Sequence, residues 1–252
     1  MKPVTVSYII ITWNGLSFMQ QLLASMKNQL AREDVEVIIV DNYSTDGTLD
    51  FLRQHYPSLE LICLPENKGV AYARNVALRR AKGEYLFIID NDICINDHAV
   101  ETMERYMDTH PEVGICGCKL MSPDGEMQES CKPYPGIRAK IRSVFRPSAP
   151  FVYYDRIYGS EPFEPVYLIG ACQMIRKEVY TAIGDLDETI FYGPEDCDYC
   201  LRARNAGWRV MYLPQVAMVH YCQRRTHANP FNRLGFLHLK ALLYFYKKYR
   251  QV

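Results

Sequence analysis

The first half of the chain alternates between short apolar runs and amphipathic stretches of helical period. The apolar runs end in polar or glycine-containing turns, as is typical of buried strands. They cover residues 4–12, 35–40, 59–64 and 85–89. The amphipathic stretches between them cover residues 16–29, 48–55 and 70–81. Strands and helices that alternate in this way predict βαβ units and a parallel sheet.

The second half of the chain is less regular. Residues 122–165 are rich in Pro and Gly, with aromatic and basic residues mixed in. That segment is too long for a simple connection, so we predict a functional loop. Helical patterns cover residues 97–109, 194–205 and 234–249, and strand-like runs cover residues 113–120, 166–169, 173–175 and 211–219.

Local signals set the expected ends of the elements and the domain plan. Asp46 or Ser44 is expected to cap the helix over 48–55, and Gly83 to stop the helix before the strand at Tyr85. The chain has no internal repeat and no low-complexity tract. We therefore predict one domain, residues 1–222, with a helical carboxyl-terminal extension, residues 223–252.

The charge balance argues against a dedicated nucleic-acid binder. The 29 basic and 29 acidic residues give a formal net charge of zero, so there is no strong overall positive field. Basic residues nevertheless gather at the carboxyl terminus, where no Asp or Glu accompanies them. They are Arg224, Arg225, Arg233, Lys240, Lys247, Lys248 and Arg250.

The cysteines indicate a reducing compartment. There are nine, an odd number, scattered along the chain and not preceded by a secretory signal. We therefore expect a cytoplasmic protein with buried thiols. Cys116 and Cys118 form a close pair, and Cys197 and Cys200 have redox or zinc spacing, but neither pair has the partner spacing of a structural zinc site.

The apolar run 85–89 is closed by Asp90-Asn91-Asp92. Residues i and i+2 of a strand point to the same side, so both carboxylates emerge together at its carboxyl end. Open α/β sheets bind ligands at that edge. Two aspartates there can hold a hard divalent cation, which can neutralise phosphate oxygens. The alternative is a polar turn that follows a strand.

Other polar residues follow the predicted strands or open the predicted helices. Asp41 ends the second strand, where it could accept from a base or a ribose hydroxyl, or cap a helix. The dinucleotide fingerprint is missing after the first strand, where Thr12-Trp13-Asn14 stands. Gly69 allows a turn at the start of the third helix. Arg74 is expected to face outward one turn later, where it could meet a phosphate or an aspartate, or stay in solvent.

Three acids in four positions open the helix over 194–205. Glu195 and Asp196 could simply favour the positive end of that helix, and Asp198 could pair with Arg202 at i, i+4. Asp196 is then left to take a proton from a hydroxyl. His220 closes the apolar stretch 211–219, either as an ordinary surface residue or as a metal ligand.

Taken in order, these motifs resemble the family 2 glycosyltransferases of the GT-A fold over roughly residues 4–222. The closest subgroup is the rhamnosyltransferase-like bacterial enzymes that build cell-surface polysaccharides. The motifs are Thr12-Trp13-Asn14, Asp41, Asn67-Lys68-Gly69, Arg74-Asn75, Asp90-Asn91-Asp92, Gly170-Ala171, Glu195-Asp196 and His220. The resemblance implies an α/β fold with a mixed, mainly parallel sheet flanked by helices.

The resemblance also implies a nucleotide-diphospho-sugar donor, UDP- or dTDP-linked, across the strand ends. The residues it assigns to the donor are Thr12, Asn14, Asp41, Asn67, Gly69, Arg74, Asp90 and Asn91. Asp92 and His220 would hold Mn²⁺ or Mg²⁺ at the diphosphate, and Asp196 would be the general base of an inverting transfer. The acceptor and sugar pocket would comprise Gly170, Ala171, Tyr192 and Glu195.

Two other functions fit the sequence less well than glycosyl transfer does. A nucleotidyltransferase would need a glycine-rich, basic loop after the first strand, and Trp13-Asn14-Gly15-Leu16 is not one. A non-catalytic sugar-nucleotide or glycan-binding module would be expected to lack Asp92 or Asp196, and both are present. For the extension, the alternatives are packing on the domain and peripheral docking on an anionic inner leaflet, where a lipid-linked acceptor would be found.

Overall fold

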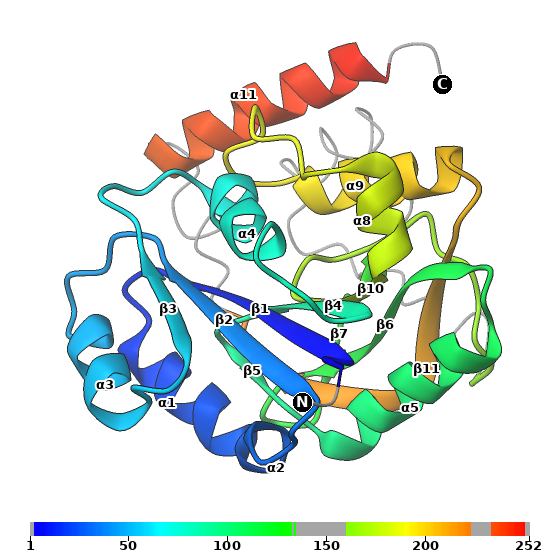
Figure 1. The fold of residues 1–252 in the computed structure, drawn as a ribbon. Helices are drawn as coiled ribbons and strands as arrows, with labels where there is room; N and C mark the ends of the chain where they lie inside the picture. Colours follow the sequence, from blue (N-terminus) through cyan, green and yellow to red (C-terminus); the bar gives the residue numbers. More distant parts are fainter. Residues whose placement is uncertain (1–2, 133, 135–159, 223–232, 250–252) are drawn as a thin grey trace.

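A nine-stranded sheet between two layers of helices forms the body of the protein (Figure 1). The structure is a computed structural model and describes residues 3–132, 134, 160–222 and 233–249. The strands are β1 (Val6–Thr12), β2 (Val35–Asp41), β3 (Glu60–Cys63), β4 (Tyr85–Asp90), β5 (Ile93–Cys94), β6 (Val113–Met121), β7 (Met127–Gln128), β10 (Cys172–Arg176) and β11 (Arg209–His220). A separate two-stranded sheet pairs β8 (Cys131–Lys132) with β9 (Tyr167–Leu168).

The helices cover the two faces of the sheet. Below it in Figure 1 lie α1 (Leu16–Ser25), α2 (Lys27–Leu30), α3 (Thr48–His55) and α5 (Asp97–Thr109). Above it lie α4 (Val70–Leu78), α8 (Lys177–Ile183), α9 (Glu195–Asn205) and α11 (Arg233–Lys248). The result is a three-layer α/β/α arrangement.

The sheet is mixed, with strand order β3-β2-β1-β4-β10-β6-β11-β5. The four strands from the first half are parallel, as the βαβ pattern predicts. β10 then enters antiparallel between β4 and β6, while β11 is parallel to β6. The parallel strands therefore end together at one edge, and the start of β10 lies at that same edge.

Burial on both faces explains the unbroken apolar runs. In β4, Phe87 packs with the core on the α1 and α5 side, while Leu86 and Ile88 pack with the core on the α4 and α9 side. In β1, Tyr8 and Ile9 divide between the two cores in the same way. A central parallel strand covered on both faces needs apolar residues at every position, so the sequence shows a run and not an alternation.

Element types were predicted better than element ends. The predicted helices over 48–55 and 97–109 match α3 and α5 in full, but the helix predicted over 16–29 is divided at Met26 into α1 and α2. The expected cap of α3 was also wrong, because Gly47 is its N-cap residue. Asp46 acts from one position further out, where its Oδ1 accepts from the Thr48 backbone N at 3.2 Å. Most of the loop predicted over 122–165 lies outside the described residues.

Six of the nine cysteines are buried, as expected, whereas Cys63 and Cys222 are exposed and Cys94 is half-buried. Cys116, Cys118, Cys172, Cys197 and Cys200 are all buried and unbridged. The sulfur atoms of Cys118 and Cys172 are 3.6 Å apart and form a weak hydrogen bond. Cys197 and Cys200 pack into the core from α9, so their spacing reflects one buried helix face.

α11 packs on the domain, which is one of the two alternatives given above for the carboxyl-terminal extension. Phe245 of α11 and Tyr249, which directly follows the helix, belong to the core above the sheet. Lys248 Nζ lies 2.7 Å from Asp187 Oδ2 and 2.6 Å from Asp198 Oδ1. No helix within the described part of the chain is long and apolar enough to span a bilayer. The division between residues 1–222 and 223–252 stays a prediction, because residues 223–232 lie outside the described part.

The Asp187 carboxylate ties α11 to the domain and gives a first testable prediction. Burial alone would raise the pKa of Asp187, but hydrogen bonds from Lys248 and Tyr244 outweigh it and lower the pKa from 3.8 to about 2. The stabilising contribution is therefore complete above pH 4 and is lost as the pH falls through 2. Asp187→Asn should cost about 1–2 kcal/mol in the free energy of unfolding at neutral pH, and less at pH 2.

Urea unfolding at several pH values measures this difference. Asp50→Asn is the matched control, because Asp50 is exposed on α3 across the sheet. Equal stability of the Asp187 and Asp50 variants at neutral pH would contradict the role given to Asp187.

Candidate active site

The carboxyl ends of three parallel strands bring the predicted polar residues together. Thr12 of β1 is in register with Asp41 of β2, and Ile11 is in register with Asp90 of β4. The Thr12 hydroxyl accepts a 3.0 Å hydrogen bond from Asn91 Nδ2, which links the turns after β1 and β4. The predicted edge of polar side chains is therefore present, and hydrogen bonds between these side chains hold them in place.

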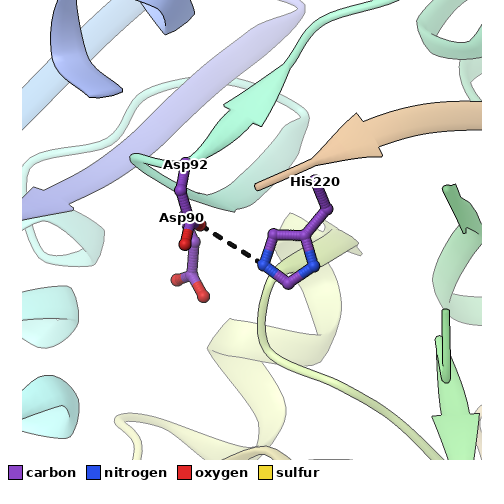
Figure 2. A group of neighbouring side chains, drawn as sticks. All are labelled: Asp90, Asp92 and His220. Atoms are coloured by element: carbon purple, nitrogen blue, oxygen red, sulfur yellow. Dashed lines mark ion pairs between the residues drawn. The ribbon is translucent and has the colours of Figure 1, made fainter. Parts of the chain in front are cut away.

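Asp90, Asp92 and His220 form a compact cluster at this edge (Figure 2). One ligand atom from each of the three lies within 4.8 Å of the others. His220 ends β11, which pairs with β5 immediately after Asp92, and the Tyr221 N donates to the Asp92 carbonyl at 2.8 Å. His220 Nε2 faces Asp92 Oδ1 at 3.3 Å. Strand pairing thus brings the predicted metal residues together from distant parts of the chain.

The chemistry of the cluster fits a divalent cation. Two carboxylates and one imidazole can bind a divalent cation, because carboxylate oxygens suit hard cations and imidazole is a common ligand of transition metals. His220 is 6% exposed, and its buried Nδ1 has no hydrogen-bond partner within the described chain. Across the described residues, this is the one group of three or more His, Cys, Asp or Glu side chains close enough to share a metal.

Arg74 lies at the centre of the site, and the expectation that it faces outward was wrong. Its side chain extends from α4 and is only 3% exposed. Nη1 donates to Glu195 Oε1 at 3.0 Å, and Nη2 donates to Asp90 Oδ1 at 2.7 Å and to the Gly170 carbonyl at 2.9 Å. Of the alternatives considered for Arg74, contact with an aspartate is the one found.

Gly170 is small because Arg74 fills the space beside it. A Cβ at position 170 would lie 2.6 Å from Arg74 Nη1, which is closer than real Cβ contacts. The neighbouring Ala171 is buried, and its carbonyl accepts from the Asp90 N at 3.1 Å. The missing side chain thus serves the ion-pair network, while the predicted role of Gly170 and Ala171 toward an acceptor stays a prediction.

The three acids at the start of α9 have separate partners. Glu195 is bound to Arg74, and burial followed by repulsion from Asp196 raises the pKa of Glu195 against the attraction of Arg74. Asp198 pairs with Arg202 at 2.9 Å, as predicted for i, i+4. Asp196 Oδ2 accepts from the Gly170 N at 3.0 Å and Oδ1 from the Cys197 N at 2.7 Å. Asp196 is thus oriented by backbone donors, whereas the acids on both sides of it are paired with arginines.

The carboxyl end of β2 holds an unsatisfied carboxylate oxygen. Asp41 is fully buried, and its Oδ2 accepts from the Ser44 N at 2.9 Å. Its Oδ1 is also buried and has no hydrogen-bond partner within the described chain. A buried acceptor without a donor costs free energy, so Asp41 Oδ1 is poised for a polar ligand. The helix-cap alternative for Asp41 finds no support in α3, whose N-cap is Gly47.

The turns after β1 and β2 are held in a strained conformation. Asn14 (φ 47°) and Tyr43 (φ 75°) are the non-glycine residues with positive φ in the described part of the chain. Each left-handed residue costs about 1 kcal/mol or more, and such strain gathers at functional sites. Asn14 Oδ1 accepts from the Thr45 N at 2.7 Å, so the two turns support each other. Trp13 and Tyr43 beside them are 40% and 51% exposed.

A buried asparagine that the sequence reasoning did not single out orders the third turn. Asn42 Oδ1 accepts from the Lys68 N at 2.9 Å, and Asn42 Nδ2 donates to Asn67 Oδ1 at 3.2 Å. Asn67 Oδ1 also accepts from the Gly69 N at 3.0 Å. The signal available in the sequence was the position of Asn42 directly after Asp41, at the end of a buried strand. Asn67 and Gly69 therefore shape the turn, and any contact with a donor stays a prediction.

Gly69 and Tyr192 connect this turn to the loop before α9. Gly69 has φ 87°, and a Cβ there would lie 2.5 Å from the Phe191 carbonyl. The Val70 N donates to that same carbonyl at 2.8 Å. Tyr192 is half-buried, and its ring meets His238 of α11 edge-on with centroids 6.1 Å apart. The predicted acceptor pocket residues Tyr192 and Glu195 thus flank a loop that contacts both α4 and α11.

Comparison with known proteins identifies the family. The family model described as "Glycosyl transferase family 2" matches residues 7–184, which include the carboxyl ends of β1, β2 and β4 but not α9 or His220. The chain belongs to glycosyl transferase family 2. The sequence resemblance inferred from the motifs is therefore confirmed.

Individual relatives and solved structures agree with this assignment. The glycosyltransferase is 25% identical to the N-acetylglucosaminyl-diphospho-decaprenol L-rhamnosyltransferase of Mycobacterium tuberculosis, over 94% of this chain and 82% of the relative. It is 29% identical to the dTDP-rhamnosyl transferase RfbF of Shigella flexneri, over 84% of this chain and 67% of the relative. The mannosyltransferase PcManGT of Pyrobaculum calidifontis, solved with GDP-Man and Mn²⁺, superposes with a TM-score of 0.62 at 22% identity, over 90% of this chain and 61% of that one. The fold is therefore GT-A, as expected.

The Arg74 network gives a second prediction. Arg74→Met removes the guanidinium that pairs with the carboxylates of Glu195 and Asp90. The change should therefore lower the free energy of unfolding by about 3–5 kcal/mol. Arg80→Met is the matched control, because it breaks an exposed pair with Glu60 that is expected to contribute less than about 1 kcal/mol. Urea unfolding with a chelator present measures both. Equal losses for the two variants would show that the buried pairs do not stabilise the fold.

Proposed function

We propose that this glycosyltransferase is an inverting, metal-dependent enzyme of cell-surface polysaccharide synthesis. It would move a hexose or deoxyhexose from a UDP- or dTDP-linked sugar to a hydroxyl of a glycan or lipid-linked acceptor. One observation supports the proposal most strongly: the Asp90, Asp92 and His220 cluster lies at the same sheet edge as Asp196. The hydrogen bonds of Arg74 connect the two, because Arg74 binds Asp90 and also Glu195, the neighbour of Asp196. The printed names of two relatives, both rhamnosyltransferases, support the substrate class.

Donor recognition is assigned to the ends of β1 and β2. The unsatisfied Asp41 Oδ1 would accept from a base N–H or a ribose hydroxyl. The exposed rings of Trp13 and Tyr43 beside it offer apolar faces to a nucleoside. Thr12, Asn14 and Asn91 would border the donor by holding the turns in place.

Asp90, Asp92 and His220 would hold Mn²⁺ or Mg²⁺ next to the donor diphosphate. When bound, the cation would supply positive charge to the oxygens that become more negative as the diphosphate leaves. Arg74 keeps Asp90 in position for this role, since its guanidinium binds Asp90 Oδ1 and the Gly170 carbonyl together.

Asp196 would act as the general base. Its carboxylate would take the proton of the acceptor hydroxyl as that oxygen forms a bond to the anomeric carbon, and the bond between that carbon and the diphosphate oxygen would break. Attack from the face opposite the leaving group inverts the anomeric configuration. The Gly170 and Cys197 backbone N–H groups donate to the two oxygens of Asp196 and fix the direction of its carboxylate.

The acceptor and the location of the enzyme follow from the same proposal. A lipid-linked oligosaccharide is the favoured acceptor, since the mycobacterial relative is named for a polyprenol-linked substrate. The enzyme would work in the cytoplasm or peripherally on the inner face of the cell membrane. Nucleic acid is not an expected partner, because the formal net charge is zero.

Calorimetric binding of UDP, dTDP, GDP and CMP, each with Mn²⁺ and with EDTA, tests the donor site. We expect one diphosphate to bind tightly with Mn²⁺ and to lose that binding in EDTA. Asp92→Asn should weaken this binding by about tenfold or more, because a carboxylate ligand becomes neutral. Failure of every nucleotide to bind under both conditions would favour a glycan-binding module of the same fold over an enzyme.

A separate variant tests the general base. Asp196→Asn should lower the transfer rate by about 100-fold or more, since an amide cannot accept the proton. Binding of the nucleotide in Mn²⁺ should stay nearly unchanged. Asp50→Asn, an exposed change on α3, is the control and should keep full activity. Substantial activity in Asp196→Asn, measured as sugar transfer from the identified donor, would overturn the assignment.

A further inference from the structure

The outer face of α11 exposes large apolar side chains. Phe236, Leu239 and Leu243 are 67%, 53% and 63% exposed. The other large apolar side chains exposed to a similar degree in the described chain, Trp13 and Tyr43, lie at the donor end of the active site. The face opposite this stripe is buried, and carries Ala241, Leu242 and Phe245. α11 is therefore apolar on both sides, although only one side is needed to attach it to the domain.

Two lysines share the exposed stripe. With 3.6 residues per turn, Phe236, Leu239, Lys240, Leu243 and Lys247 fall within a sector of roughly 100° of the helix. Lys240 and Lys247 are exposed, and among the described residues no ion pair engages either of them. Lys248, by contrast, points to the domain and pairs with Asp187 and Asp198. The stripe thus combines apolar side chains with uncompensated positive charge.

The part of the sequence that contains α11 is basic and carries no acid. The sequence from Arg224 to Arg250 contains seven basic residues, at 224, 225, 233, 240, 247, 248 and 250, and no Asp or Glu. A second copy of the chain docked through this stripe in a two-fold dimer would set lysine against lysine, which is unfavourable. A partner surface that buries apolar side chains and also carries negative charge would match both the apolar side chains and the lysines of the stripe.

We propose that the outer face of α11, formed by Phe236, Leu239, Lys240, Leu243 and Lys247, docks on the surface of an anionic phospholipid bilayer. The helix would lie along the surface, with its apolar side chains at the acyl boundary and its lysines at the headgroups. Figure 1 shows α11 along the outside of the molecule, above α4 and α9, in keeping with the exposure of Phe236, Leu239 and Leu243.

The first turns of α11 lie next to the acceptor side of the candidate site. His238 Nδ1 is 3.1 Å from the Tyr192 carbonyl and 3.2 Å from the Gly193 carbonyl. Only Pro194 separates these two residues from Glu195 and Asp196 in the sequence. Docking through α11 would therefore hold the loop that leads to the proposed general base close to the bilayer. The inference adds to the proposed function, but its test needs neither donor nor acceptor.

Flotation of the full chain with vesicles tests the proposal. We expect binding to phosphatidylcholine vesicles that contain phosphatidylglycerol, weaker binding to pure phosphatidylcholine, and weaker binding at high salt. Lys240→Gln with Lys247→Gln should reduce binding to the anionic vesicles by about tenfold or more. Leu239→Gln with Leu243→Gln should reduce it by a similar factor, because both side chains leave the acyl boundary. Lys27→Gln, on α2 at the opposite side of the molecule, is the matched control and should bind as the unmodified protein does.

Three results would overturn the proposal. One is no binding of the unmodified protein to the anionic vesicles, and another is equal binding by the stripe variants and the control. The third is a dimer in sedimentation that the leucine variants abolish while vesicles stay unbound, because the stripe would then serve a second copy of the chain. Unfolding curves check that the variants are folded, and nucleotide binding, measured separately, tells a failed docking surface from a failed active site.

Discussion

A single buried guanidinium links the two halves of this glycosyltransferase at the candidate active site. Arg74 comes from α4 in the parallel half, and its partners include Glu195 and the Gly170 carbonyl from the half that follows. A buried arginine without counter-charges would be strongly unfavourable, and so would Glu195 without a cation. Each group is therefore stable only if the others are in place. The sheet edge, the loop at Gly170 and the start of α9 thus form together.

The same network separates the roles of neighbouring acids. Arg74 takes up the charge of Glu195 and part of that of Asp90, while Arg202 takes up that of Asp198. Asp196 lies between these two paired acids, and its carboxylate accepts hydrogen bonds from the backbone N–H groups of Gly170 and Cys197. Three acids in four positions would repel one another on an ordinary helix end. Here each has a distinct electrostatic environment, which is what acid–base chemistry requires.

The sequence was sufficient for the strand ends but not for the centre of the site. Asp41, Asp90 and Asp92 could be placed at one edge because buried parallel strands are apolar throughout and stop where polar residues begin. Asp92 and His220 were matched through resemblance to a family, and strand pairing brings them together. Arg74 could not be placed, because its partners are 16, 96 and 121 residues away and only the tertiary fold makes them neighbours. The cap of α3 was missed for a local reason, since Gly47 has a left-handed φ of 87° that suits it to the turn.

The direction of β10 has a consequence for how enzymes of this architecture can diversify. Because β10 runs antiparallel to β4, the residues that precede β10 reach the active-site edge, and those that follow it lead directly into α8 on the far side. A change of length or composition before β10 is therefore felt at the sheet edge next to Gly170, while β1, β2 and β4 stay as they are. Under the function proposed above, such a change would alter the acceptor side of the site and leave the donor side constant.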